Sequence, residues 1–254
     1  MKKHSFPIIE FDSDTTAFIN PTGKALKQPL HERVVICFFH EIIDQLEKEG
    51  ILTCVDVLKG ENAVPIYMFN DIPVSLVPGR LGAPACAGYF EDFIAHGAKH
   101  IMFCGGAGVL SDKVSLGHYV LVDSAIRDEG TSYHYLPPSR EVKADARMLE
   151  HIKQYLDRHG VPYITGKTWT TDAFYRETAA RIAARKEEGA LVVEMEQAAM
   201  FAVSQFRDVR YGAILYGGDD LTQSVWDGRG WRTQPTTRRA LTLLCKDILM
   251  TIDN

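Results

Sequence analysis

The run His100-Ile101-Met102-Phe103-Cys104, followed directly by Gly105-Gly106-Ala107-Gly108, decides the fold. An apolar run of this length is typical of a strand buried on both faces of a sheet, and the glycines predict that the strand ends at position 104. A second run of similar character covers positions 118–126. We therefore expect a central sheet with helices on both of its faces.

Strand and helix patterns alternate over the rest of the chain. Apolar, β-branched or aromatic runs predict further strands at 34–39, 65–69, 74–77, 163–168, 190–193 and 211–216, with Asn70-Asp71 as the turn of a hairpin. Apolar residues at helical spacing predict helices at 40–50, 84–94, 149–160, 178–188, 194–206 and 241–252. The alternation predicts an α/β fold, a three-layer αβα arrangement around a mixed, largely parallel sheet.

The composition is that of a globular protein. The chain has 254 residues, 46% of them hydrophobic, and its 28 lysines and arginines against 33 acidic residues give a net charge of −5. A chain of this length buries roughly 70–75% of its unfolded surface on folding, which makes a sizeable core. No linker composition divides the sequence, so we treat 1–254 as a single domain. An acidic balance without a basic block argues against binding to nucleic acid.

The sequence carries no sign of a membrane or metal protein. Its first residues lead into Glu10, Asp12 and Asp14 rather than an apolar segment, so we expect no signal peptide, and no apolar run approaches the ~20 residues of a membrane span. Five cysteines without a CxxC pair indicate reduced thiols in a cytoplasmic protein. Because HExxH and EF-hand patterns are absent, we expect neither a metal nor a cofactor.

Motifs with chemical content follow the predicted strands, where the ligands of α/β proteins bind. They are GGAG at 105–108, RDEGTSYHY at 127–135, TTDAFY at 170–175, EME at 194–196 and GGDD at 217–220. Together they resemble the nucleoside phosphorylase family, which includes hexameric purine nucleoside phosphorylases, uridine phosphorylases and methylthioadenosine nucleosidases. The resemblance rests mainly on VEMEQAA at 193–199, close to the family's VEMEAA, and on DEGTSYHY at 128–135.

The resemblance implies cleavage of an N-glycosidic bond through an oxocarbenium-like sugar, with inorganic phosphate as co-substrate and ribose 1-phosphate as product. Glu196 would accept hydrogen bonds from both vicinal ribose hydroxyls, and its charge would lie beside a sugar that becomes cationic. Met195 would form an apolar wall against the ribose. The alternative from the residues alone is that Glu194 and Glu196 only favour a helix N-terminus.

Aromatic and acidic residues are the candidates for the base. Phe174, Tyr175 and Tyr135 offer faces that stack on a planar heterocycle, the alternative being core or lid aromatics. Asp219 falls where purine-cleaving relatives carry the aspartate that protonates N7 of the leaving base. Asp220 competes with it, because the alignment can slip by one residue, and a turn or cap role is the alternative for both.

The phosphate site departs from the family pattern. Relatives use arginines from a GDPxR turn and an RxGSxG or RxGTxG turn, whereas this chain has Phe38 and Phe39 near the first position and Phe103 at the second. Substitute candidates are the backbone N–H groups of Gly105 and Gly106 and the side chains of Arg80 and Arg127. Alternatively, Arg80 is a solvated loop residue and Arg127 pairs with its acidic neighbours.

Several readings therefore stay open. A phosphorylase is our first expectation, with a purine favoured over uridine because of Asp219. Hydrolysis by water would need a general base such as Glu194 or Glu41. A non-catalytic nucleoside-binding protein is the third reading. The resemblance also implies a homodimer or homohexamer, in which His4 would serve a neighbouring ribose unless it lies in a solvated tail. The motifs of dinucleotide enzymes and of lipase-like hydrolases are missing.

Overall fold

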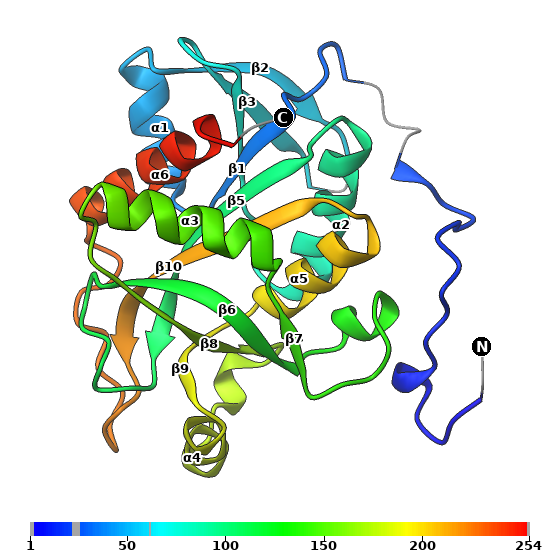
Figure 1. Ribbon diagram of the computed structural model, residues 1–254, viewed down its shortest axis with the longest axis vertical. Helices are drawn as coiled ribbons and strands as arrows, with labels where there is room; N and C mark the ends of the chain where they lie inside the picture. The colour runs from blue at the N-terminus through cyan, green and yellow to red at the C-terminus, as the bar shows by residue number, and fades with distance from the viewer. Residues whose placement is uncertain (1–2, 22–25, 61, 253–254) are drawn as a thin grey trace.

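A mixed, mostly parallel sheet of ten strands organises the chain (Figure 1). The computed structural model describes residues 3–21, 26–60 and 62–252. The strands are β1 (Arg33–Cys37), β2 (Leu52–Leu58), β3 (Val64–Phe69), β4 (Val74–Pro78), β5 (His100–Val109), β6 (Tyr119–Asp128), β7 (Glu141–Lys143), β8 (Tyr163–Thr171), β9 (Ala190–Glu194) and β10 (Arg210–Asp220). The helices are α1 (His40–Lys48), α2 (Ala83–Ala95), α3 (Ala146–Arg158), α4 (Ala179–Glu187), α5 (Gln197–Phe206) and α6 (Pro235–Met250), with short 3-10 turns η1 (Pro7–Ile9), η3 (Thr131–His134) and η4 (Phe174–Arg176).

Part of the sheet closes on itself. The strand order is β10-β6-β8-β9-β5-β1-β4-β3-β2, and β10 also pairs with β5. Strands β5, β9, β8, β6 and β10 therefore form a closed ring, from which β1, β4, β3 and β2 extend as an open wing. The predicted hairpin is confirmed, because β3 and β4 pair antiparallel.

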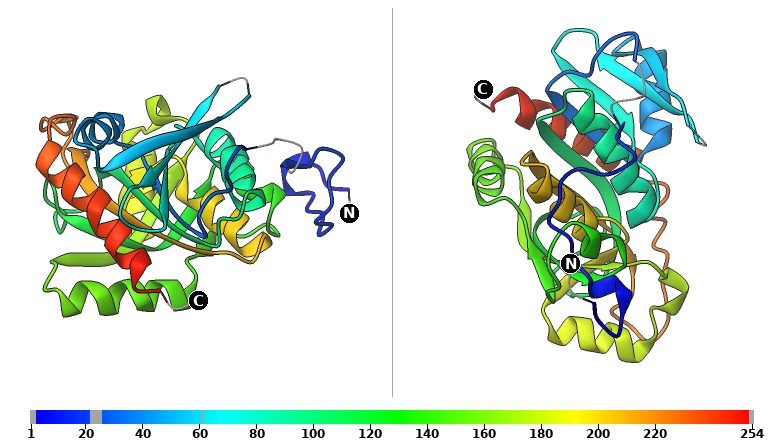
Figure 2. Two further views of the ribbon diagram at one scale, coloured as in Figure 1. Left: turned by 90° about the horizontal axis from the view of Figure 1, so that it is seen from above. Right: turned by 90° about the vertical axis from the view of Figure 1, so that its right-hand side faces the viewer.

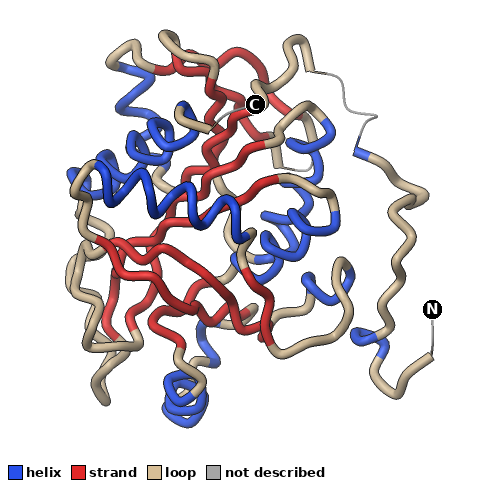
Figure 3. The backbone as a smooth tube through the Cα atoms, in the orientation of Figure 1, coloured by secondary structure: helices blue, strands red, loops and turns tan. Residues whose placement is uncertain are grey.

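Helices cover both faces of the sheet, which confirms the three-layer arrangement (Figure 3). On one face, α2 and α5 pack through residues such as Phe90 and Phe201 into one apolar core. On the other, α1, α3 and α6 bury Ile42, Ile152 and Leu241 in a second core. The N-terminal stretch 3–21 runs along the outside of the molecule (Figures 1 and 2), and the Arg207 guanidinium donates to the carbonyl of Thr15 within it.

The expectation that strands end at the glycine runs was wrong. β5 continues through Gly105–Gly108 to Val109, and β10 continues through Gly217 to Asp220. The two strands pair in parallel with Gly106 opposite Tyr216, and a Cβ on Gly106 would lie 3.1 Å from the Tyr216 ring. These glycines thus allow close packing inside the ring of strands.

Two strands and one helix start also differ from the expectation. Strands β2 and β7 carry no clear apolar pattern, because their residues are largely exposed or half-buried, and the sequence did not reveal them. The helix expected from position 194 begins only at Gln197, because Glu194 still belongs to β9. The segment between β9 and α5 is therefore a turn, and this turn carries the acidic motif.

Candidate active site

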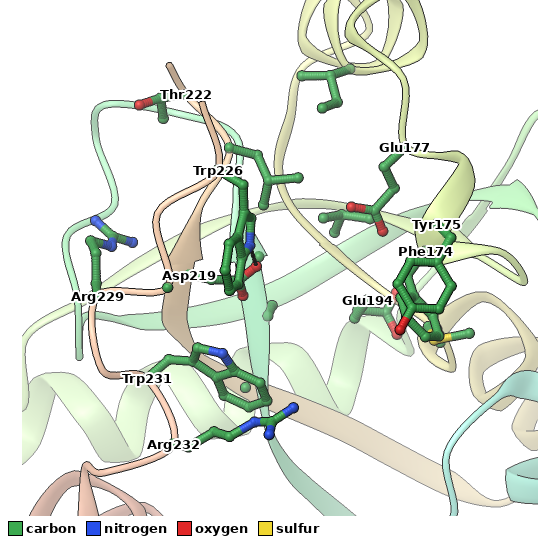
Figure 4. A pocket seen from close by; sticks show the side chains of 18 of the residues that line it. Phe174, Tyr175, Glu177, Glu194, Asp219, Thr222, Trp226, Arg229, Trp231 and Arg232 are labelled. Carbon is green, nitrogen blue, oxygen red and sulfur yellow. Dashed lines mark hydrogen bonds between the residues drawn. The ribbon is translucent and has the colours of Figure 1, made fainter. Parts of the chain in front are cut away.

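A cavity of about 1380 Å³ lies where β5, β9 and β10 meet the turn at η4 and the start of α4. Residues 221–234, which we call the Trp226 segment, form its remaining wall (Figure 4). Its polar and aromatic lining includes Phe38, Phe39, Gly106, Phe174, Tyr175, Glu177, Lys186, Glu194, Met195, Glu196, Asp219, Trp226, Arg229, Trp231, Arg232 and Arg238. Among the described residues, no cluster of His, Cys, Asp or Glu side chains is suited to a metal ion.

Glu194 serves the turn between β9 and α5. One carboxylate oxygen accepts hydrogen bonds from the hydroxyls of Thr170 at 2.5 Å and Thr168 at 3.2 Å. The other accepts the backbone N–H groups of Glu196 at 2.6 Å and Gln197 at 2.7 Å. Four donors therefore satisfy this side chain, as expected of an acid that caps a helix N-terminus.

Glu196 stands at the same turn but keeps free hydrogen-bonding capacity. It is only 4% exposed, and its Oε1 accepts the backbone N–H of Gly82 at 2.7 Å. Gly82 has a φ of +90°, a conformation that favours glycine, and it is the N-cap residue of α2. Burial, together with the charge of Glu194, raises the pKa of Glu196. The wall of the cavity thus carries a carboxyl group that gains from any hydrogen-bond donor.

An aromatic pair lies on the same side of the cavity as Glu194 (Figure 4). Phe174 and Tyr175 belong to η4, and their ring centroids are 4.1 Å apart at an interplanar angle of 45°. Phe174 is 45% exposed and Tyr175 is 90% exposed, so neither is a core residue. Both rings are available to a planar ligand.

The structure distinguishes the two candidate aspartates of β10. Asp219 lines the cavity, and its Oδ2 accepts the indole N–H of Trp226 at 2.7 Å (Figure 4). Asp220 forms an ion pair with Arg229 at 3.3 Å and accepts the backbone N–H of Thr222. Successive side chains of a strand point to opposite faces, which explains why only Asp219 lines the cavity.

Sequence reasoning missed one carboxyl group in the cavity. Glu177 follows η4, and its side chain points into the cavity (Figure 4). Burial, with the charge of Asp219 as a second cause, raises the pKa of Glu177 to about 7. In the sequence, Glu177 could have been noticed because it lies two residues after Tyr175, a candidate for the base site.

Two predicted site residues are absent from the cavity lining because other contacts engage them, Arg127 with the loop after β6 and Tyr135 with α5. Arg127 is 4% exposed, and its guanidinium donates to the hydroxyls of Ser132 and Ser139 and to the carbonyls of Leu136 and Pro137. Tyr135 packs edge-on against Phe206, with centroids 5.6 Å apart. Both residues stabilise the loop after β6.

Three other candidates are also placed outside the lining. Arg80 donates to the carbonyl of Ala63 at 2.5 Å, and its guanidinium lies 5.7 Å from the Tyr89 ring centroid. Gly105 lies inside β5, although Gly106 does line the cavity. His4 is exposed, and its backbone N–H donates to Glu10.

Phe38 and Phe103, near the positions where the resemblance led us to expect phosphate-binding arginines, form an aromatic pair with ring centroids 4.8 Å apart. The cations that line the cavity are Lys186 of α4, Arg229 and Arg232 of the Trp226 segment, and Arg238 of α6. Arg238, which is 7% exposed, forms an ion pair with Glu41 at 2.5 Å and donates to the Tyr216 hydroxyl at 2.9 Å. Arg232 lies over the Trp231 ring, and no carboxylate in the described ranges pairs with it.

Comparisons with known proteins relate the chain to nucleoside-cleaving enzymes. Residues 32–245 match the family model described as Phosphorylase superfamily. A uridine phosphorylase of Thermococcus kodakarensis is 28% identical over 107 residues, which are 42% of this chain and 39% of that protein. A guanosine phosphorylase of Halorubrum lacusprofundi is 27% identical over 146 residues, 58% of this chain and 61% of that protein. Each match thus spans less than two thirds of the relative.

Solved structures share the fold over a larger part of the chain. A uridine phosphorylase of Vibrio fischeri has a TM-score of 0.73 at 20% identity and covers 88% of this chain and 93% of its own. An AMP nucleosidase of Bacteroides thetaiotaomicron has a TM-score of 0.70 at 21% identity, covering 87% and 90%. Within residues 3–21, 26–60 and 62–252, no helix is long and apolar enough to cross a membrane.

Proposed function

Because the chain belongs to the phosphorylase superfamily, we propose that it cleaves the N-glycosidic bond of a purine nucleoside with phosphate as the acceptor. The products are the free base and ribose 1-phosphate. Glu196, beside Met195, is the observation that carries the proposal. Its carboxyl group is buried and held on one oxygen by Gly82, and the remaining hydrogen-bonding capacity suits the two vicinal hydroxyls of a ribose.

The charge of Glu196 also suits the chemistry. As the glycosidic bond breaks, the ribose becomes cationic. The ribose hydroxyls and this developing positive charge both favour the ionised form of Glu196, and the carboxylate in turn stabilises the charge on the sugar. Glu194 holds the turn that carries Glu196, so the carboxylate is positioned before the substrate arrives. We assign Glu196 to the ribose and Glu194 to the support of this turn.

Four further residues of the cavity supply what a purine base requires. Phe174 and Tyr175 present ring faces for stacking. Asp219 and Glu177 bring two carboxyl groups to the same space. A purine leaves poorly as an anion, so acids at its edge favour a purine substrate.

Arg238 and Arg232 are the cations available for phosphate in place of Arg80 and Arg127. Both line the cavity, and Arg238 is fixed by Glu41 and Tyr216 beside Gly106. An arginine held by several partners binds an oxyanion with little loss of side-chain entropy. Arg232, with no carboxylate partner in the described chain, adds an uncompensated positive charge.

Hydrolysis is a second candidate, favoured by one observation. Phe38, which packs on the buried Phe103, and Phe39 give the cavity an apolar lining near the place where the resemblance expects a phosphate arginine, and water needs no cation there. Glu41, held by Arg238, is then the candidate base. Glu194 is unsuited to that role because its oxygens already accept four hydrogen bonds.

The test is release of free base from adenosine, inosine, guanosine and uridine, each with and without phosphate. Glu196→Gln is compared with wild type and with Glu150→Gln, a control at an exposed position of α3. Phosphate-dependent release that only Glu196→Gln loses supports the proposal, and release in water alone supports hydrolysis. Thermal stabilisation by nucleosides without any release indicates a binding protein and contradicts both.

A further inference from the structure

We propose that Glu177, and not Asp219, donates the proton to the departing base, while Asp219 acts as the positioning residue that keeps this proton on Glu177. The inference rests on the proposed function, because it assigns the acid of that reaction. It follows from how differently the two carboxyl groups are bonded in the same cavity.

Asp219 is engaged as a hydrogen-bond acceptor. An indole N–H donates and never accepts, so the Asp219 oxygen that lies 2.7 Å from Trp226 has to be an acceptor. Figure 4 shows the indole of Trp226 directly against this carboxyl group. This oxygen is therefore engaged with the indole and is not the donor of a proton to the base.

Glu177 has the opposite surroundings. Its backbone N–H donates to the carbonyl of Phe174 at 3.2 Å, and Thr178 next to it caps α4, so the backbone around Glu177 is fixed. Its carboxyl group points into the cavity, and no residue in the described ranges donates to it or forms an ion pair with it (Figure 4). A half-buried carboxyl group without a donor favours its neutral form, and the negative Asp219 across the cavity adds to this.

Several other charged groups line the same cavity as Glu177. Arg229 is paired with Asp220 and Arg238 with Glu41, which offsets much of their charge. The titratable and charged groups that share the space with Glu177 are Tyr175 of η4, Lys186 of α4, Glu194 and Glu196 of the β9–α5 turn, Asp219 of β10, Arg229 and Arg232 of the Trp226 segment, and Arg238 of α6.

In the proposed step, the bond between C1′ and the base nitrogen breaks, and its electron pair stays with the base. The Glu177 proton moves to a ring nitrogen of the base, which then leaves as a neutral molecule, and Glu177 becomes a carboxylate. A phosphate oxygen bonds to C1′. The proton that phosphate gives up on becoming an ester returns through solvent to Glu177.

The experiment compares guanosine with 7-methylguanosine, whose base departs neutral without receiving a proton. Glu177→Gln, Asp219→Asn and the control Glu187→Gln, at an exposed position of α4, are assayed with both substrates over a pH range. We expect Glu177→Gln to lose about 100-fold or more in kcat/KM on guanosine and only a few-fold on 7-methylguanosine. Asp219→Asn should lose less, and the alkaline limb of its guanosine profile should move to lower pH.

Activity on 7-methylguanosine also shows that each variant is folded. The inference is overturned if Glu177→Gln cleaves guanosine normally, if it loses equally on both substrates, or if Asp219→Asn shows the selective loss instead. If wild type cleaves neither substrate, the proposed function itself fails, and the assignment of an acid fails with it.

Discussion

The β9–α5 turn and the Trp226 segment form opposite walls of one cavity and are built very differently. In the turn, Glu194 is buried and bound by four donors, two from β8, one from the turn itself and one from the start of α5. The Trp226 segment is joined to β10 by backbone bonds between Asp220 and Asp227, and Trp226 itself is 63% exposed. Because the β9–α5 turn is bonded to the protein core, we expect mutations in it to alter stability. The Trp226 segment is bonded to β10 where it leaves the strand, so we expect mutations further along it to alter ligand binding.

The largest effect should come from Glu194→Gln. The amide keeps the shape of the side chain but lacks the charge, and its NH₂ group faces donors, so we expect a loss of about 3 kcal/mol in the free energy of unfolding. Urea unfolding measures it, with Glu150→Gln as the exposed control. An unchanged unfolding midpoint would show that the β9–α5 turn depends less on the Glu194 carboxylate than its four hydrogen bonds indicate.

The second-largest effect should be the contribution of Glu196 to the pH dependence of the free energy of unfolding. Its folded-state pKa lies above its unfolded value, so between these two values the folded state binds more protons and stability falls as the pH rises. Each pH unit in this window lowers the free energy of unfolding by up to about 1.4 kcal/mol. Glu196→Gln should flatten the decline between pH 5 and pH 8 in urea unfolding. Equal slopes for the variant and wild type would contradict the assigned shift.

Gly82→Ala tests the backbone donor of the fixed wall. At a φ of +90° an alanine is strained, so we expect a loss of about 1–2 kcal/mol and weaker binding of the ribose. Gly88→Ala on the same helix is the matched control, because its φ is not positive and its added Cβ would contact nothing within 4 Å. That change should stabilise by roughly 0.5 kcal/mol. A similar result at both positions would contradict the role of Gly82.

The smallest effect on stability should come from Trp226→Phe. The ring is kept and only the N–H bond to Asp219 is lost, so the free energy of unfolding should change by less than about 1 kcal/mol. KM for the nucleoside, or its dissociation constant, should rise by several-fold. A large drop in the unfolding midpoint would show that the Trp226 segment belongs to the core as firmly as the β9–α5 turn does.

The sequence predicted the layers and the order of most elements and singled out the acidic motif, because these depend on local periodicity and on one specific motif, but it placed that motif in a helix rather than in a turn. It chose Arg127 and Arg80 as phosphate ligands from their nearness to motifs, whereas the carbonyls and hydroxyls that bind Arg127 lie in the following loop. Arg238 and Glu41 are 197 positions apart, and no local pattern reveals such a pair. Glu177 was missed because its raised pKa comes from burial without a hydrogen-bond donor in the described ranges, and only three-dimensional contacts show this.

The closed ring of strands also determines when during synthesis the protein can become functional. β10 closes the ring by pairing Arg210 with His100, residues 110 positions apart, and it carries Asp219. Such distant pairing makes folding slow, and it cannot begin until β10 has left the ribosome. Until then, β5 and β6 lack a common neighbour, and a nascent chain that already contains the acidic turn still has no cavity around it.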